Sequence, residues 1–291
     1  MMSSRSNLLS AICYLLSAIC VSAATPADTR LSLAASLGEA GDYARSALEY
    51  RRLAADLEPG DPSLPGLYLA AADAYRHEGS WERLGKMLDK AEDVGAGGSA
   101  PLLLLRVAEA EGLRDWLSAA DYADELADAS GKDERLTSWA RGAAASDYLR
   151  LRKGVEALGA VAGDHDRAAA IDRYVNGRDK SPTVGGLLGI VPGLGYAYSG
   201  EWGNMFRSIF LNGIFGWAMF ECADREQWGL FAVTTFFELT WYSGSIYGGI
   251  DAAHRYNRDR IDDAARELRG GEGPSLRPEN RLNVFSMRLE F

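Results

Sequence analysis

A short junction recurs four times in the first half of this 291-residue chain, and it constrains the fold more than any other feature. The copies end in an aromatic residue: "GDY" at Tyr43, "GSW" at Trp81, "RDW" at Trp116 and "SDY" at Tyr148. The aromatic residues lie 38, 35 and 32 positions apart. A period of this size is typical of stacked helix–turn–helix units. Residues 27–175 are therefore predicted to form an all-α repeat domain.

The second unit resembles the tetratricopeptide-repeat family residue by residue. Its large, small and aromatic positions match the family pattern without a gap at Tyr68, Ala72, Tyr75, Gly79, Trp81, Leu84, Leu88 and Ala91. The small side chain of Ala72 would let two helices approach, and Gly79 would form the tight turn between them. The second helix of the first unit matches the family pattern when a shift of one residue is allowed, and the third unit matches it less well. The fourth barely qualifies, as a capping or linking helix would.

The resemblance implies an interaction scaffold, because the family shares no chemistry. The positions of the second unit that would face the family's concave groove are Leu69, Asp73, Arg76 and His77. Family members that clamp a C-terminal carboxylate use Asn and basic residues there, and Asp73 departs from that pattern. An unidentified protein partner is thus expected in the groove. The alternative is that the four residues belong to a solvated helix face.

Residues 1–23 have the build of a secretory signal peptide. Arg5 precedes the apolar run "LLSAICYLLSAICVSA", and Val21 and Ala23 suit cleavage after Ala23. Such a leader would place the repeat domain outside the cytoplasm, whereas the alternative is an uncleaved N-terminal anchor. Cleavage would leave Cys222 as the only remaining cysteine, so no intrachain disulfide is expected.

Charge and motif content exclude several classes of function. The formal net charge of −10 argues against a nucleic-acid partner, because phosphate binding needs a concentrated basic face. The histidines His77, His165 and His254 are scattered, and neither a G-x-S-x-G element nor a Cys–His pairing occurs. We therefore expect no enzyme activity, no cofactor and no metal site.

Two apolar segments in the second half, residues 205–223 and 228–250, are each long enough to cross a hydrocarbon core of about 30 Å. A short hydrophilic loop separates them, which predicts a membrane helical hairpin. Asn212 and Glu238 each lie thirteen residues from Arg225, so they are expected at equal depth and joined by a hydrogen bond. This pair would be a structural lock or, alternatively, a proton- or ion-coupled site.

Glycines in the two segments favour close packing of membrane helices. They are Gly213 and Gly216 in the first segment, with Gly244, Gly248 and Gly249 in the second. Small residues let helix backbones approach in a membrane. Gly244 and Gly248 also form a G-x-x-x-G pair.

The segment before the hairpin, residues 183–200, is apolar but interrupted by proline and glycine. This predicts a broken helix that re-enters or kinks against the hairpin. The block "PGLGYAYSGEWGNMF" resembles a Pro-Gly-x-Gly-x-x-Tyr-x-Gly element of small two-helix membrane domains in bacterial envelope proteins. The match rests on Pro192, Gly193, Gly195, Tyr198 and Gly200. The resemblance implies membrane placement for residues 183–254 and says little about activity.

The number of membrane passes stays open. Three passes result if residues 183–200 cross the bilayer, and two result if they only re-enter. Tyr196, Tyr198 and Trp202 are expected at the membrane interface as an aromatic belt.

Two more elements follow the hairpin. Residues 255–269 are predicted to form a charged amphipathic helix, and residues 270–291 a linker and tail. The tail alternates as one face of a strand would, at Phe285, Met287, Leu289 and Phe291.

These patterns predict a non-enzymatic helical-repeat scaffold of the bacterial cell envelope. We expect an inner-membrane protein whose repeat domain lies in the periplasm and binds a protein partner, while its hairpin contacts the lipid bilayer. The alternative is a subunit of a membrane transport or export complex in which Glu238 and Asn212 are functionally active.

Overall fold

A computed structural model describes residues 26–131 and 133–270. Within these ranges every regular element is a helix and no strand is present, which confirms the all-α fold class. The chain divides into two compact units between Thr137 and Ser138. The expected signal peptide and the alternating C-terminal tail lie outside the described residues.

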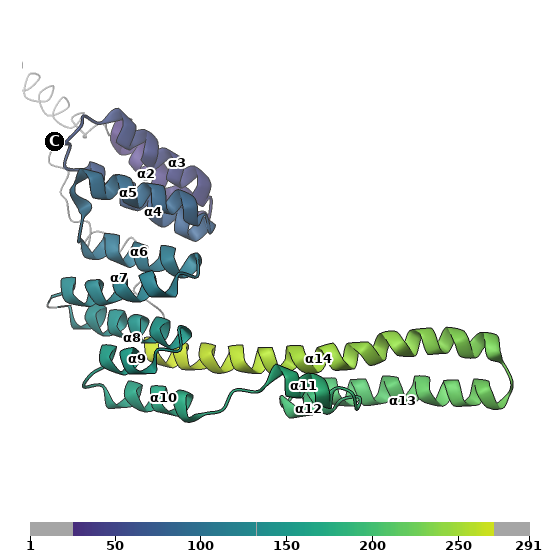
Figure 1. The fold of residues 1–291 in the computed structure, drawn as a ribbon. Coiled ribbons are helices and arrows are strands. Elements are labelled where there is room, and N and C mark those ends of the chain that lie inside the picture. Colours follow the sequence, from purple (N-terminus) through teal and green to yellow (C-terminus); the bar gives the residue numbers. More distant parts are fainter. Residues whose placement is uncertain (1–25, 132, 271–291) are drawn as a thin grey trace, which may run out of the picture. The chain divides into compact units, whose positions relative to one another are not determined.

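The first unit consists of successive helix pairs (Figure 1). α2 (Pro26–Glu39) pairs with α3 (Tyr43–Asp56), and α4 (Leu64–Glu78) pairs with α5 (Trp81–Ala91). A single π-helical turn, η1 (Glu92–Ala96), continues α5. The last pair is α6 (Ala100–Gly112) with α7 (Trp116–Ala129). This order of paired helices is the arrangement that the repeated junctions predict.

The same tight turn joins the two helices of each pair. Gly41, Gly79 and Arg114 have left-handed backbone conformations, with φ of 82°, 78° and 61°. Each donates its N–H to the carbonyl three residues back, and the next N–H reaches the carbonyl five residues back. This is the Schellman geometry that ends many helices. The second helix then begins at the junction's aromatic residue, which is Tyr43, Trp81 or Trp116.

The fourth junction was predicted at the wrong place. Tyr148 lies inside α8 (Glu134–Arg150), and the turn falls at Arg152, whose φ is 63°. The hydrogen bonds at Arg152 repeat those of the other three turns, and α9 (Gly154–Ala160) follows. The "SDY" triplet cannot start a helix here because its Ser and Asp are fully buried in α8. A fourth helix pair therefore exists, but its junction is "RKG" and has no aromatic residue.

The core of the first unit contains five of the eight residues on which the predicted repeat pattern rests, namely Ala72, Tyr75, Leu84, Leu88 and Ala91. Ala72, Leu84 and Leu88 are fully buried, and Tyr75 is nearly so. They form one cluster with residues of α2, α3 and α6. Ala72 therefore lies in the core, and Gly79 forms the turn between α4 and α5.

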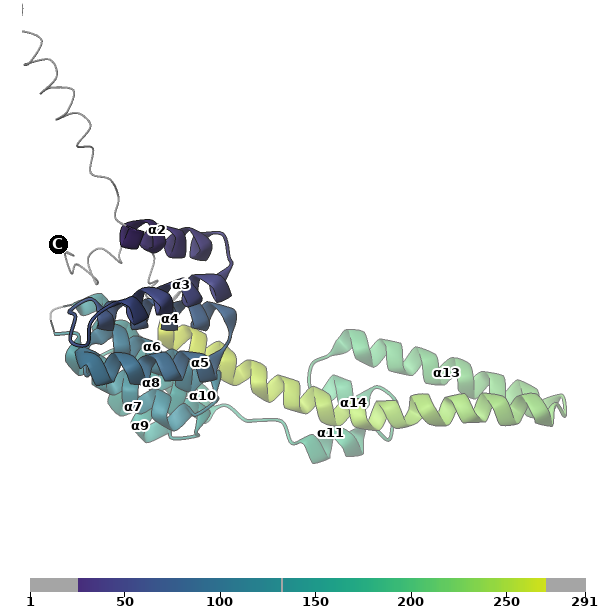
Figure 2. The same ribbon diagram turned by 90° about the horizontal axis from the view of Figure 1, so that it is seen from above.

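The second unit combines a small helical layer with a long hairpin (Figures 1 and 2). The layer contains α8, α9 and α10 (His165–Asn176), and the hairpin consists of α13 (Trp202–Asp224) and α14 (Trp228–Arg269). Two short helices, α11 (Pro182–Leu188) and α12 (Leu194–Tyr198), pack against α14 at one end of the hairpin.

α14 is one continuous helix of 42 residues. The sequence predicted two separate helices, 228–250 and 255–269. No glycine or proline interrupts residues 251–269, so nothing in this stretch breaks the backbone hydrogen bonding. The helix ends at Gly270, which is left-handed with φ of 68°. Its last turns pack on the helical layer, where Ala264 and Leu268 share a core with Leu149 and Ile171.

The chain enters and leaves the hairpin at the same end. Lys180 donates its backbone N–H to Asn257 Oδ1 at 2.8 Å, and Asn257 Nδ2 donates to the Lys180 carbonyl at 2.8 Å. Residues 183–200 fold into α11 and α12 and do not run the length of the hairpin. Residues 183–200 therefore do not form a third long helix beside α13 and α14, and the number of membrane passes stays a prediction.

No helix within residues 26–131 and 133–270 is both long enough and apolar enough to cross a membrane. A helical hairpin is present where the two apolar segments predict one, but its expected membrane-spanning character is unsupported.

Candidate functional site

The Pro-Gly-x-Gly-x-x-Tyr-x-Gly element forms the base of the hairpin. Pro192 lies in the turn between α11 and α12, and Gly193 caps α12 with φ of 88°. Gly200 turns the chain from α12 into α13 with φ of 83°. The hydroxyl of Tyr198 accepts the backbone N–H of Ser181 at 3.0 Å. These residues shape and fix the base.

Three glycines bring α11, α12 and α14 into backbone contact. A Cβ atom on Gly185 would lie 2.4 Å from the carbonyl oxygen of Gly249. A Cβ atom on Gly195 would lie 2.5 Å from the carbonyl oxygen of Gly185 and 2.7 Å from the Cα of Gly249. Only glycine fits at these positions without a shift of the backbone, which explains the glycine-rich composition of the segment.

The glycines of the hairpin itself have two different surroundings. Gly249 lies in the three-glycine contact and Gly248 faces the ring of Tyr196. A Cβ atom on Gly213, Gly216 or Gly244 would meet no atom within 4 Å. These three glycines therefore do not line a close contact with any described residue.

A chain of polar groups follows the contact between α13 and α14. Gly193 donates its N–H to Ser245 Oγ at 3.2 Å, and the hydroxyl of Ser208 lies 3.2 Å from that of Ser245. Asn212 Nδ2 then donates to the carbonyl of Ser208 at 2.7 Å. Ser245 and Asn212 are buried, 2% and 8% exposed. Polar side chains thus lie between the two helices of the hairpin.

The predicted hydrogen bond between Asn212 and Glu238 is not formed. The Ser208–Ser245 contact centres the hairpin between residues 226 and 227, whereas the prediction assumed Arg225. The shift places Glu238 about one helical turn nearer the loop than Asn212. Asn212 Oδ1 and Glu238 Oε2 are both buried without a hydrogen-bond partner in the described part of the chain.

The outside of the hairpin is covered with large apolar side chains. Those that are at least 66% exposed are Phe206, Phe210, Trp217, Phe220, Phe236 and Tyr247. They come from both helices and from most of the length of α13. Such a surface exceeds the scattered apolar exposure of an ordinary soluble domain and indicates an interaction site.

Paired charges lie at the base of the hairpin. Glu201, the N-cap residue of α13, accepts hydrogen bonds from Arg255 Nε at 2.8 Å and Nη2 at 2.9 Å. Asn204 Nδ2 donates to the same carboxylate at 2.6 Å. The Arg255 hydrogen bonds, with a smaller contribution from Asn204, hold the pKa of Glu201 below its ordinary value.

The predicted groove residues of the first unit do not form one exposed surface. Leu69 is 4% exposed and belongs to the core. Asp73 is also buried, and its Oδ1 accepts hydrogen bonds from Arg76 Nε at 3.0 Å and Nη2 at 2.8 Å. The ring of His77 stacks on Tyr43 with centroids 4.9 Å apart. Arg76 and His77 are partly exposed, whereas Leu69 and Asp73 are not accessible to a partner.

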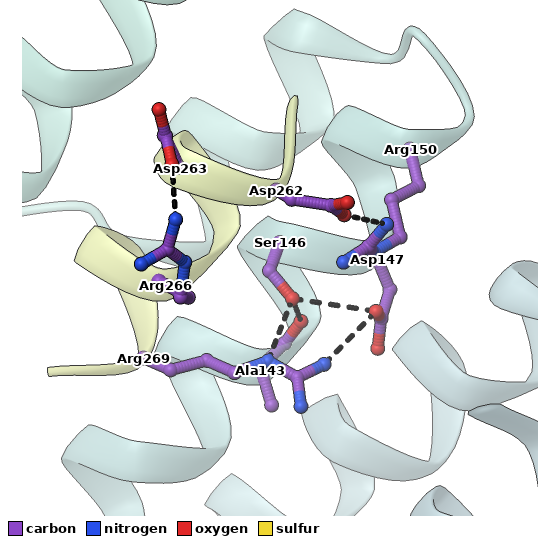
Figure 3. A network of polar contacts seen from close by, with 8 residues as sticks. All are labelled: Ala143, Ser146, Asp147, Arg150, Asp262, Asp263, Arg266 and Arg269. Carbon is purple, nitrogen blue, oxygen red and sulfur yellow. Dashed lines mark hydrogen bonds and ion pairs between the residues drawn. The ribbon is translucent and has the colours of Figure 1, made fainter. Parts of the chain in front are cut away.

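A buried polar cluster that the sequence analysis missed attaches the end of α14 to α8 (Figure 3). Asp147 is fully buried, and its Oδ1 lies 3.2 Å from Arg269 Nη2. Arg269 Nε also donates to Ser146 Oγ at 3.1 Å, and Arg150 pairs with Asp262 at 2.8 Å. The sequence does show Ser146 and Asp147 directly after a run of alanines, a pattern that fits a buried helix face. These two residues were instead interpreted as part of the fourth junction.

No three His, Cys, Asp or Glu side chains of the described ranges are grouped as metal ligands would be. Comparison of the chain with protein-family models, curated proteins and solved structures finds no significant match.

Proposed function

We propose that this chain is a non-enzymatic helical-repeat scaffold of the bacterial cell envelope, attached to a lipid bilayer by its α13–α14 hairpin. Its repeat unit would bind a protein partner on the periplasmic side of the inner membrane. The observation that supports attachment to lipid is the distribution of polarity in the hairpin, with polar side chains between the helices and apolar ones outside.

This distribution is the reverse of that in a water-exposed hairpin. In water, two helices bury an apolar stripe and expose polar faces. Here Ser208, Asn212 and Ser245 face the partner helix while Phe210 and Trp217 face outward. In a lipid bilayer the polar side chains of a hairpin face the partner helix, because hydrocarbon offers them no hydrogen bonds. Lipid would also surround the hairpin on every side, which accounts for exposed apolar side chains on both α13 and α14.

The ends of the hairpin also fit a lipid environment. α13 has 23 residues, or about 34 Å at 1.5 Å per residue. Its tip carries the Glu221–Arg225 ion pair, and its base carries the Glu201–Arg255 pair. Ion pairs thus lie at both ends of the hairpin.

Flotation of the purified full chain with phosphatidylcholine vesicles tests this attachment. We expect the wild type to float, and a Phe210→Asp, Phe236→Asp variant to stay with the unbound protein. The matched control is Leu113→Asp with Val155→Asp, which changes two exposed apolar residues outside the hairpin and should still float. Circular dichroism checks that each variant is folded. A wild type that stays at the bottom of the gradient would refute attachment to lipid and leave the apolar surface to a protein partner.

Two further experiments measure how deeply the hairpin inserts into the bilayer and on which side of the membrane the repeat unit lies. Quenching of tryptophan fluorescence by lipids brominated at defined acyl positions reports depth. Protease added to intact spheroplasts should cut the repeat unit if it lies in the periplasm. Full protection would contradict that placement.

A second candidate function is a transport or export subunit, and one observation favours it. Asn212 Oδ1 and Glu238 Oε2 are two buried oxygens without a partner within the described residues, and an ionisable group of this kind in a membrane often serves transport. Replacing Glu238 by Gln separates the two functions. A folded variant with full cellular activity supports the scaffold, whereas loss of activity with intact folding supports transport.

A further inference from the structure

Basic residues gather around the linker between α10 and α11. Asp179 Oδ2 lies 2.7 Å from Arg152, and Asp179 Oδ1 lies 2.5 Å from Arg260. The hydrogen bonds between Lys180 and Asn257 place the neighbouring Arg178 and Arg258 at about the same level along α14. Arg258 lies about 200° round the helix from Arg260. We call Arg152, Arg178, Lys180, Arg258 and Arg260 the linker cluster.

The linker cluster has an excess of positive charge in a chain whose net charge is −10. Asp179 neutralises part of it through Arg152 and Arg260. Arg178 and Arg258 are exposed and form no ion pair within residues 26–131 and 133–270. Asp259 is adjacent to Arg258 in sequence but lies about 100° further round the helix.

Lys180 is held in place by two aromatic rings. Its Nζ atom lies 4.7 Å from the ring centroid of Tyr198 and 5.3 Å from that of Tyr256. Cation–π contacts of this kind stabilise an ammonium group without neutralising its charge. The tyrosine of the Pro-Gly-x-Gly-x-x-Tyr-x-Gly element thus fixes a cation at the base of the hairpin.

The linker cluster lies just beyond the apolar part of the hairpin. In the Ser208–Ser245 register, Trp202 at the start of α13 is level with Asp251. Arg258 is seven residues further along α14, which is about 10 Å. The headgroup layer on each side of a bilayer is about 5–8 Å thick. A hairpin inserted to the level of Trp202 would place Arg258 about 2–5 Å outside this layer, within one Debye length of the lipid charges.

We propose that the linker cluster binds anionic phospholipid headgroups and makes attachment selective for membranes that contain them. This inference rests on the proposed attachment of the hairpin to lipid and adds the class of lipid. Each exposed basic residue near an anionic surface contributes about 1 kcal/mol, or roughly fivefold in partitioning.

The experiment compares the full chain on phosphatidylcholine vesicles with and without one third phosphatidylglycerol. We expect tighter partitioning onto the anionic vesicles. The difference should disappear at about 1 M salt, where the Debye length falls to about 3 Å. The variant Arg178→Gln, Arg258→Gln should lose roughly thirtyfold on anionic vesicles and nothing on neutral ones. The control Arg114→Gln, Arg135→Gln removes the same charge from exposed arginines of the first unit and should partition as the wild type.

Each other outcome contradicts a specific statement. Equal partitioning of the wild type onto both vesicles overturns lipid selectivity but leaves attachment intact. Equal losses in the two double variants would show a net-charge effect and overturn the role of the linker cluster. Failure to bind either vesicle contradicts attachment itself. Competition by free glycerol phosphate would assign the cluster to a soluble anion instead.

Discussion

Lys180 and Asn257 are joined by two hydrogen bonds, in which the Asn257 side chain contacts both the N–H and the carbonyl of Lys180 at 2.8 Å. The residues are 77 positions apart. This contact fixes the linker before α11 to the C-terminal third of α14. It therefore sets where the chain enters the hairpin.

Replacing Asn257 by Ala should release this linker. Two hydrogen bonds of about 1 kcal/mol each would be lost, so the free energy of unfolding should fall by about 2 kcal/mol. Amide hydrogen exchange at Lys180 should become faster. Asn176→Ala, at the exposed end of α10, is the control and should leave exchange at Lys180 unchanged. Unaltered protection in the Asn257 variant would show that the linker is held by other contacts.

The three-glycine contact predicts opposite effects for two Gly→Ala substitutions in one helix. Gly249→Ala would push a methyl group against the Gly185 carbonyl and should lower the free energy of unfolding by about 1–3 kcal/mol. Gly244→Ala meets no atom within 4 Å and should raise helix stability by about 0.5–1 kcal/mol. Urea unfolding of both variants measures the difference. Equal effects would contradict the close packing of α11 on α14.

The buried contact between Asp147 and Arg269 should be worth far more than a surface ion pair. Arg269→Ala leaves a fully buried carboxylate with one contact fewer, so we expect a loss of about 3–5 kcal/mol in the free energy of unfolding. Arg266→Ala breaks a pair with Asp263 whose side chains are 78% and 67% exposed and should cost at most about 1 kcal/mol. Thermal unfolding compares the two. Similar small losses would mean that the end of α14 does not depend on this cluster.

Acid should weaken the base of the hairpin through Glu201. Because the Arg255 hydrogen bonds lower its pKa in the folded state, the contribution of Glu201 to stability is complete above its ordinary pKa of about 4.5. The contribution is lost as pH falls through the lower folded pKa. The wild type should therefore lose more stability than Glu201→Gln in this window. Stability measured from pH 6 to pH 3 checks the sign, and parallel curves for the two proteins would contradict it.

The helix pairs of the first unit could be predicted because their signals are local. Gly79 supplies the left-handed turn and Trp81 begins the next helix, so a few adjacent residues define the junction. The fourth turn could not be found in this way. Arg152 adopts the same conformation without glycine and without a following aromatic residue, and Asp147 is buried by a helix end 122 positions away.

The hairpin was predicted from its two apolar segments, but its register was not. The left-handed residue at the tip is Glu226, with φ of 56°, and the sequence carries no glycine there to mark it. An error of one and a half residues in the centre of the loop moved Asn212 and Glu238 apart by three residues, which is about one helical turn. Register depends on such contacts as Ser208 with Ser245, which join residues that no local pattern links.

The docking of the end of α14 on the layer of α8–α10 has a consequence during protein synthesis. Ile171 and Leu268 share one core although they lie 97 positions apart in the chain. At about 5–20 residues per second, a ribosome needs roughly 5–20 s to make the chain between them. The apolar face of the α8–α10 layer therefore stays uncovered while the whole hairpin is being synthesised. The last turns of α14 then close it.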